Sequence, residues 1–251
     1  MAITKTRMSA EILIRLNKFI ANAGLCSRRK ADELIQSGKV NVGGRIVTNL
    51  GIKINPLRDK VFVNHRQVVV MDRPVYIVFN KPKDCITTAS DERGRTTVMD
   101  YVRLKERVFP VGRLDRNTTG VLLLTNDGEF ANRLMHPKFE IKKTYKVTLE
   151  QPLKPQDADK LIQGVRLSDG KTQPAEIYYL PGGKKRVIGI VIHEGRNRQV
   201  HRMFEALGYE VEKLDRVAYA DITYEGLPHG SWRNLTRQEV EKLKSAAGAS
   251  E

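Results

Sequence analysis

One loop of the chain places a single carboxylate between two guanidinium groups. Asp115 lies between Arg113 and Arg116 in the Gly/Asn/Thr-rich segment Gly112–Gly120, which runs into the apolar stretch Val121–Leu124. Two neighbouring arginines favour the ionised form of a carboxyl group, and a carboxylate held at the start of a buried strand can be a nucleophile. The same residues could equally form a structural ion pair, and the pattern alone does not decide between these roles.

A second group of candidate residues lies in the segment Glu194–Phe204. Val200, Met203 and Phe204 recur at the spacing of one face of a helix. The basic members of the segment are Arg196, Arg198, His201 and Arg202. Clustered cations suit contact with phosphate groups, whereas the simpler alternative is a solvated helix face.

Motifs that would indicate a bound cofactor or metal are absent from the sequence. It has neither a GxxxxGK[ST] loop nor a GxGxxG loop, so a nucleotide cofactor lacks support. His193-Glu194 begins like an HExxH zinc motif, but Asn197 stands where the second histidine is required. Cys26 and Cys85 form no CxxC pair and are expected to be small core residues. We therefore expect no metal and no cofactor, so the protein must work with its own side chains.

The positive charge of the chain is concentrated at one end. The 251 residues carry a formal net charge of +15, and the first 66 hold 13 Lys and Arg against 4 Asp and Glu. A basic module of this kind usually binds a polyanion, either nucleic acid or an anionic membrane surface. No run of about 18 apolar residues could span a bilayer, and residues 1–7 lack the apolar core of a secretory signal. We expect a cytoplasmic protein.

Residues 11–70 are expected to form a small module that follows a disordered tail at residues 1–10. Apolar side chains recur at helical spacing over Ile12–Ala23. Ser27 is a good N-cap for a second helix, which Gly38 should end. Residues 67–74 are a plausible linker to the rest of the chain.

Three cations, Arg28, Arg29 and Lys30, fall in the first turn of that second helix. Positive charge at a helix N-terminus opposes the helix dipole. This placement favours phosphate contact over three merely solvated charges. A tight hairpin at residues 40–46 and a strand at Val61–Val63 should complete the module.

The second domain is expected over residues 74–245. Its first strand is predicted at Tyr76–Lys81, before a proline. Further strands are predicted at residues 121–124, 144–149, 175–179 and 187–192. Helices are predicted around Phe130–Leu134 and Val200–Leu207, and a capping box at Thr236–Glu239 should open a last one. Strands outnumber helices without regular βαβ alternation, which predicts an α+β domain on a largely antiparallel sheet.

The segments Arg15–Ile20 and Ser27–Ala31 resemble an S4 RNA-binding domain, and the resemblance extends over about residues 14–66. S4 domains occur in several kinds of protein, so the resemblance implies RNA binding and no particular chemistry. The residues that it would place against RNA are Arg15, Lys18, Arg28, Arg29 and Lys30.

The Gly-Arg-Leu-Asp sequence that ends at Asp115 resembles the active-site motif of the RsuA-type pseudouridine synthases, which isomerise uridine in ribosomal RNA. Further matching segments lie in the family's order at Asn80–Pro82, Leu134–Pro137, Lys142–Val147 and Gly230–Thr236, so the similarity covers about residues 14–243. The fold that it implies is an S4 domain followed by a pseudouridine synthase catalytic domain.

The resemblance also implies roles for single residues. Asp115 would attack the flipped nucleotide or assist cleavage of its glycosidic bond, and Tyr145 would stack on the uracil and join proton transfer. Arg113 and Arg116 would bind flanking phosphates or occupy the space that the flipped base leaves. Arg196 would contact RNA. By pattern alone Tyr145 is an ordinary strand tyrosine.

At His201 the chain departs from the family. The residue after Gln199-Val200 is usually Arg or Lys and pairs with the catalytic aspartate. Either a protonated His201 takes that place beside Asp115, or Arg202 or Arg198 does. The hypothesis we adopt is the first, because a neighbouring carboxylate raises the pKa of a histidine. Activity should then fall at alkaline pH as His201 loses its proton.

The resemblance thus implies a monomeric cytoplasmic enzyme that isomerises one uridine of ribosomal RNA. Leu134–Pro137 looks most like the branch that acts on 23S rRNA, where a hairpin would be the substrate. Two alternatives stay open: a 16S rRNA synthase and a non-catalytic RNA-binding ribosome assembly factor. A membrane-surface protein is disfavoured because no basic amphipathic helix has a strong apolar face.

Overall fold

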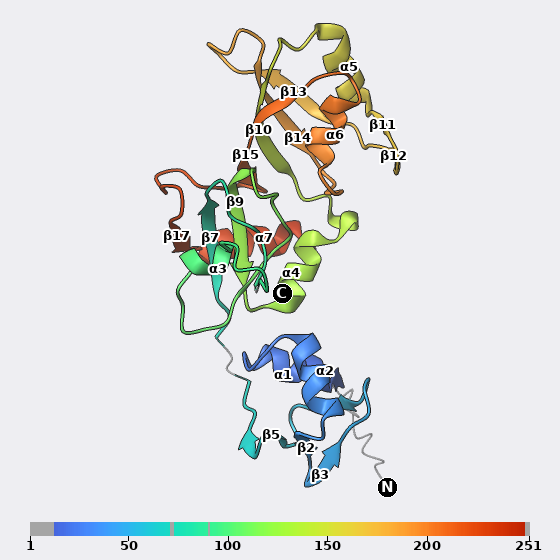
Figure 1. Ribbon diagram of the computed structural model, residues 1–251, viewed down its shortest axis with the longest axis vertical. Coiled ribbons are helices and arrows are strands. Elements are labelled where there is room, and N and C mark those ends of the chain that lie inside the picture. Colours follow the sequence, from blue (N-terminus) through green and yellow to red (C-terminus); the bar gives the residue numbers. More distant parts are fainter. Residues whose placement is uncertain (1–12, 71–72, 90, 249–251) are drawn as a thin grey trace, which may run out of the picture. The chain divides into compact units, whose positions relative to one another are not determined.

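The computed structural model describes residues 13–70, 73–89 and 91–248 (Figure 1). The expected tail at residues 1–10 lies outside them. The chain divides into two compact units, Met1–Arg73 and Pro74–Glu251. No helix in the described part of the chain is both long and apolar enough to cross a membrane.

The first unit packs two short helices against small antiparallel sheets. Its helices are α1 (Leu16–Asn22) and α2 (Arg28–Gln36). Its strands are β1 (Ile14–Arg15), β2 (Val40–Val42), β3 (Arg45–Val47), β4 (Lys53–Ile54), β5 (Val61–Val63) and β6 (Arg66–Gln67). One apolar cluster, built from residues such as Leu16, Ile35 and Val61, joins the helices to the strands.

Most local predictions for this unit are confirmed. The side chain of Ser27 accepts a hydrogen bond from the amide of Lys30 at 3.1 Å, which makes it the N-cap of α2. The hairpin β2–β3 turns through Gly43 and Gly44. The predicted start of the first helix near Ile12 is wrong. The helix begins at Leu16, because the preceding residues form β1 and pair with β4.

The second unit is built on a nine-stranded sheet. Its main path runs β13-β14-β10-β15-β9-β7-β17, while β8 pairs with β9 and β16 pairs with β15. The strands are β7 (Tyr76–Lys81), β8 (Phe109–Pro110), β9 (Thr119–Thr125), β10 (Lys143–Leu149), β13 (Glu176–Tyr179), β14 (Val187–Ile192), β15 (Val211–Tyr219), β16 (Ile222–Thr223) and β17 (Trp232–Asn234). Only the pair β9–β15 is parallel among the described strands, so the prediction of a largely antiparallel α+β domain is confirmed.

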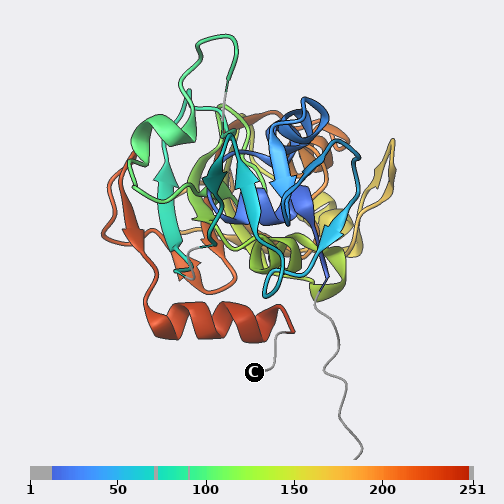
Figure 2. The same cartoon turned by 90° about the horizontal axis from the view of Figure 1, so that it is seen from below.

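Helices and a small hairpin complete the second unit. They are α3 (Val98–Tyr101), α4 (Gly128–Met135), the 3-10 turn η1 (Pro137–Phe139), α5 (Pro155–Gln163), α6 (Gln199–Glu205), α7 (Arg237–Ala246), and the separate hairpin β11 (Arg166–Leu167) with β12 (Gly170–Lys171). The predicted capping box opens α7, the long red helix of Figure 2.

Strand β9 is buried on both faces. Leu122 and Leu124 point into one apolar cluster with α5 and α6, and Val121 and Leu123 point into a second cluster with α4 and α7. This alternation explains the continuous apolar run that follows the Asp115 loop. The strand therefore gives that loop a rigid base.

A bulge in β15 decides which of its side chains face the same way. Tyr145 of β10 lies opposite Arg216 of β15, but the preceding Thr144 lies opposite Ala218, so Val217 is an extra residue. A bulge shifts the alternation of side chains by one position. Arg216 and Tyr219 are three residues apart, and yet they point to the same side: the guanidinium carbon lies 5.2 Å from the centre of the tyrosine ring.

Candidate active site

The second unit contains a cavity of about 410 Å³ in front of strands β10 and β15. Its wall includes the loop Gly112–Asp115, the segment Leu134–Pro137, and the segment Ile192–Val200. Asp115 and Tyr145, which are 30 positions apart in the sequence, both line it. Tyr145 is only 8 % exposed, and Asp115 is partly exposed.

A buried lysine, Lys81, forms hydrogen bonds to the backbone of the loop that carries Asp115. Lys81, at the end of β7, is completely buried, and its ammonium donates to the carbonyl oxygens of Pro82 at 3.1 Å, Arg116 at 3.1 Å and Thr118 at 2.9 Å. Burial lowers the pKa of Lys81 to about 8, although the charge of Asp115 is among those that act in the other direction. Two of these hydrogen bonds, those to Arg116 and Thr118, fix the backbone of the loop just after Asp115.

A threonine fixes the other side of the loop. The hydroxyl of Thr87 donates to the carbonyl oxygen of Leu114 at 2.7 Å and accepts from the Leu114 amide at 3.2 Å. Backbone on each side of Asp115 is thereby anchored, whereas the carboxylate itself forms no ion pair within the described residues. Such an arrangement presents a carboxylate to a ligand rather than to the protein.

The two arginines beside Asp115 are both exposed. Arg116 forms an ion pair with Asp84 at 3.1 Å, in which both side chains are more than half exposed. Arg113 lines the cavity. The structural ion pair that the sequence left open therefore involves Arg116 and Asp84, not Asp115.

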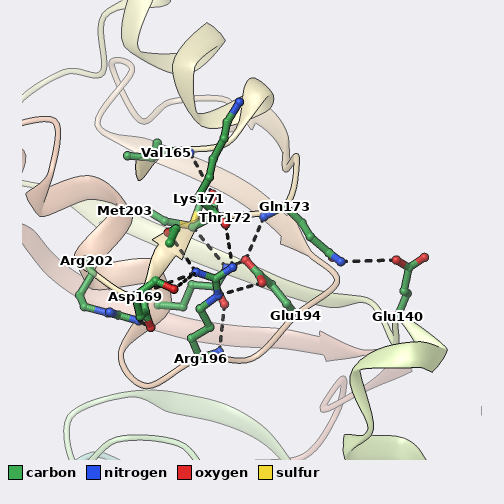
Figure 3. Close-up of polar contacts among 12 residues, drawn as sticks. Glu140, Val165, Asp169, Lys171, Thr172, Gln173, Glu194, Arg196, Arg202 and Met203 are labelled. Atoms are coloured by element: carbon green, nitrogen blue, oxygen red, sulfur yellow. Dashed lines mark hydrogen bonds and ion pairs between the residues drawn. The ribbon is translucent and has the colours of Figure 1, made fainter. Parts of the chain in front are cut away.

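Two basic residues of the segment Glu194–Phe204 form hydrogen bonds and ion pairs with other residues of the protein (Figure 3). The guanidinium of Arg196 contacts the Glu194 carboxylate at 3.0 Å and the carbonyl oxygens of Gly170 at 3.0 Å and Lys171 at 2.7 Å. Arg202 binds Asp169 at 2.9 Å, which holds the pKa of that carboxyl below its usual range. Both arginines thus tie the hairpin β11–β12 to the cavity wall, and a role of either in RNA binding or catalysis stays a prediction.

The surroundings of His201 lower its pKa instead of raising it. Burial lowers its pKa, and the positive charge of Arg198 lowers it further, against the weaker opposite effects of Asp115 and Glu205. The direction of this shift opposes the hypothesis of a protonated His201, which stays a prediction.

Arg198 is the basic residue of the segment that stays available at the cavity. It is the N-cap residue of α6, with a left-handed φ of 47°, and it lines the cavity. Its contact with Glu205 is long, at 3.5 Å, and both side chains are about half exposed. Exposed pairs of this kind contribute little free energy.

In the first unit, Arg28, Arg29 and Lys30 occupy the first turn of α2 as predicted and are all exposed. Lys30 forms a surface ion pair with Glu33 at 2.6 Å. Arg15 is exposed and Lys18 is half-buried. These cations leave a charged surface on the side of α2 where its free amide groups point.

Comparison with known proteins identifies both units. Residues 75–206 match the family model described as RNA pseudouridylate synthase, and residues 14–56 match that of the S4 domain. The chain is 50 % identical to a ribosomal large subunit pseudouridine synthase B from Bacillus subtilis, over 93 % of this chain and 96 % of that protein.

The chain belongs to the RNA pseudouridine synthases.

Other members of the family agree in extent and in fold. A dual-specificity RNA pseudouridine synthase, RluF of Escherichia coli K12, is 35 % identical over 90 % of this chain and 77 % of its own length. A crystal structure of a pseudouridylate synthase superposes with a TM-score of 0.68 at 32 % identity, and the match covers 92 % of this chain and 99 % of that one. The expected family and fold class are confirmed.

Sequence reasoning missed two residues that line this pseudouridine synthase cavity, Lys143 and Arg216, and one that holds its Asp115 loop, Lys81. Lys81 stood inside a quoted motif without a role, and its place in a buried strand was the available signal. Lys143 alternates with Tyr145 along β10, so the period of a strand already predicts that they share a face. Arg216 had no such signal, because only the bulge in β15 turns it toward the cavity.

Proposed function

We propose that this protein converts one uridine of 23S ribosomal RNA to pseudouridine, acting as a monomer in the cytoplasm. The observation that carries the proposal is the meeting of Asp115 and Tyr145 in one cavity of a pseudouridine synthase domain. The relative from Bacillus subtilis is named for the large ribosomal subunit, which supports 23S over 16S rRNA. A hairpin is the proposed substrate, since its loop bases are unstacked and accessible.

The reaction is an isomerisation, so substrate and product contain the same atoms. The target base leaves the stack and enters the cavity. Asp115 attacks the nucleotide or assists breakage of the bond between C1′ and N1. The uracil then turns, C5 bonds to C1′, the proton on C5 is lost, and N1 gains a proton. Tyr145 lies against the base during these steps and can take part in proton transfer.

Arg113, which lines the cavity, and Arg116 are both exposed beside Asp115 and would bind the phosphates on either side of the flipped nucleotide. Arg198 is the proposed cationic support of Asp115, because it lines the cavity and the pKa of His201 is lowered. The S4 domain supplies affinity through Arg28, Arg29 and their neighbours.

The proposal is tested by mapping pseudouridine in whole rRNA from cells that lack this protein. One 23S position should lose the modification and regain it when the wild-type gene is returned. If a 16S position lost its pseudouridine instead, the protein would still be a pseudouridine synthase, but its substrate would be 16S rRNA. If every pseudouridine persisted in the deletion strain, the chain would instead be an RNA-binding assembly factor.

Replacement of Arg28, Arg29 and Lys30 by glutamine should weaken RNA binding and reduce its salt dependence. Removal of one cation that binds a phosphate should lower the slope of log K against log salt by about 0.7 to 0.9. The fold of the unit should survive, because removing cations from a helix N-terminus relieves an unfavourable dipole interaction. Filter binding to a 23S fragment at several salt concentrations measures the effect.

A matched control removes three exposed cations from α7: Arg237, Lys242 and Lys244. The change in net charge is the same, so a general electrostatic effect would weaken binding equally in both triple variants. Equal weakening would contradict the assignment of RNA contact to α2.

A further inference from the structure

Two cationic side chains of the cavity wall, Lys143 and Arg216, both lie near the ring of Tyr219. We call these three residues the cationic floor of the cavity. Lys143 lies opposite Tyr219 across β10 and β15, and Tyr145 lies opposite Arg216. The Lys143 ammonium lies 5.6 Å from the centre of the Tyr219 ring, and the Arg216 guanidinium carbon lies 5.2 Å from it. All four side chains line the cavity that also contains Asp115.

The guanidinium of Arg216 has unused hydrogen-bonding capacity. The residue is 3 % exposed, and its Nε donates to the carbonyl oxygen of Val121 at 2.7 Å. Its Nη2 atom is buried and has no hydrogen-bond partner within the described residues. A buried donor without an acceptor is costly, and an acceptor on a ligand in the cavity would satisfy it.

The positive charge of this floor is also poorly balanced. Lys143 donates to the carbonyl oxygen of Ile141 at 2.9 Å, and burial together with the charge of Arg216 lowers its pKa to about 8. Glu194 is the carboxylate that acts on Lys143, but it already binds Arg196 and Gln199. Two neighbouring cations without an anion of their own attract negative charge.

Because most of the cationic floor is buried, only part of the RNA substrate can reach it. Arg216 is buried, whereas the exposed cations Arg113 and Arg116 lie beside Asp115 at the loop. Phosphates remain on the RNA backbone, while the flipped base is the part that enters the enzyme. Uracil presents two carbonyl oxygens, which are acceptors that match the N–H groups of lysine and arginine.

We propose that Lys143 and Arg216 bind the carbonyl oxygens of the target uracil and stabilise its negative charge when the glycosidic bond breaks. This inference rests on the proposed function. When the bond between C1′ and N1 breaks, its electron pair stays on the uracil, and the charge spreads to the two carbonyl oxygens. Preformed donors aimed at such developing charge lower the barrier and need no rearrangement during the reaction.

The test compares Lys143→Met with wild type and with Lys142→Met. Lys142 is the preceding residue in the sequence, is exposed, and pairs with Glu176 at the surface, so it matches the change in charge without touching the floor. Lys143→Met should lower kcat for a 23S fragment by about 10²-fold with little change in KM, as loss of one oxyanion donor does in other enzymes. Lys142→Met should keep wild-type kcat.

A second substrate separates charge stabilisation from misfolding. Fluorine at C5 withdraws electrons and makes uracil a better leaving anion, so RNA with 5-fluorouridine at the target should depend less on the cations. Single-turnover cleavage of the C1′–N1 bond, followed by nucleoside mass spectrometry, should show a smaller deficit for Lys143→Met on this RNA than on normal RNA. If the Arg216→Gln variant folds, it should also show a smaller deficit on the fluorinated RNA. If it does not fold, the result for Lys143→Met alone tests the inference.

Three results would overturn the inference. They are an unchanged kcat for Lys143→Met, a rise in KM with kcat intact (which would indicate a phosphate site), and an equal deficit on normal and fluorinated RNA (which would indicate a structural role). Failure of the proposed function is distinguishable, because wild type and Lys142→Met would then form no pseudouridine either.

Discussion

Asp115→Asn is expected to abolish pseudouridine formation while RNA binding and stability stay close to wild type. The amide has the shape of the carboxylate, but it is neither a nucleophile nor a base at neutral pH. Asp115 has no ion-pair partner among the described residues, and backbone atoms hold its loop through Lys81 and Thr87. Release of tritium from C5 of labelled uridine in RNA measures turnover, and filter binding measures affinity.

Asp84→Asn is the matched control for that experiment. Asp84 is an exposed acid whose contact is an ion pair with Arg116 on the same loop as Asp115, so its replacement changes the net charge equally. Exposed pairs of this kind contribute at most about 1 kcal/mol, and activity should persist. Joint loss of binding and turnover in Asp115→Asn would mean that Asp115 has a structural role instead.

Gly120→Ala is expected to destabilise the second unit strongly. Gly120 has a φ of +100°, and an added Cβ would lie 2.3 Å from the carbonyl oxygen of Arg216 and 2.7 Å from the Asp215 carboxylate. The clash falls on backbone at the parallel contact between β9 and β15, where neither strand can move without opening the sheet. Backbone strain and overpacking together should cost at least about 2 kcal/mol.

Urea unfolding of Gly120→Ala, followed through the transition of the second unit, measures that cost. Gly226→Ala is the control, because Gly226 also has a positive φ of +71° but no atom within 4 Å of an added Cβ. It should lose only about 1 kcal/mol from backbone strain. Similar losses in both variants would show that the close contact with Arg216 contributes nothing.

The sequence predicted correctly those structural elements that depend on residues close together in the chain. The Ser27 cap, the Gly43-Gly44 turn and the Thr236 capping box each act within four residues, and each is found where the sequence places it. The apolar strands around Leu122 were equally readable, because burial on both faces leaves a continuous apolar run. Asp115 was identified as a candidate by its neighbours and by family resemblance.

Long-range features were not predictable in this way. Strand β15 is central to the sheet, but its two register shifts break the alternation of apolar and charged residues that would have marked it. The ammonium of Lys81 is buried because carbonyl oxygens more than 30 positions later in the chain accept its hydrogen bonds. The lowered pKa of His201 results from burial and from Arg198, which the motif alone does not reveal.

The place of β15 in the sheet also determines when the enzyme can first work. Strands β7 and β9 lie on one side of it and β10, β14 and β13 on the other, and in the described residues β15 alone pairs with both groups. During synthesis all five strands leave the ribosome before residues 211–219 do. Asp115 and Tyr145 therefore stay on separate half-sheets until the last fifth of the chain emerges, so a prematurely terminated chain would fold in part and have no activity.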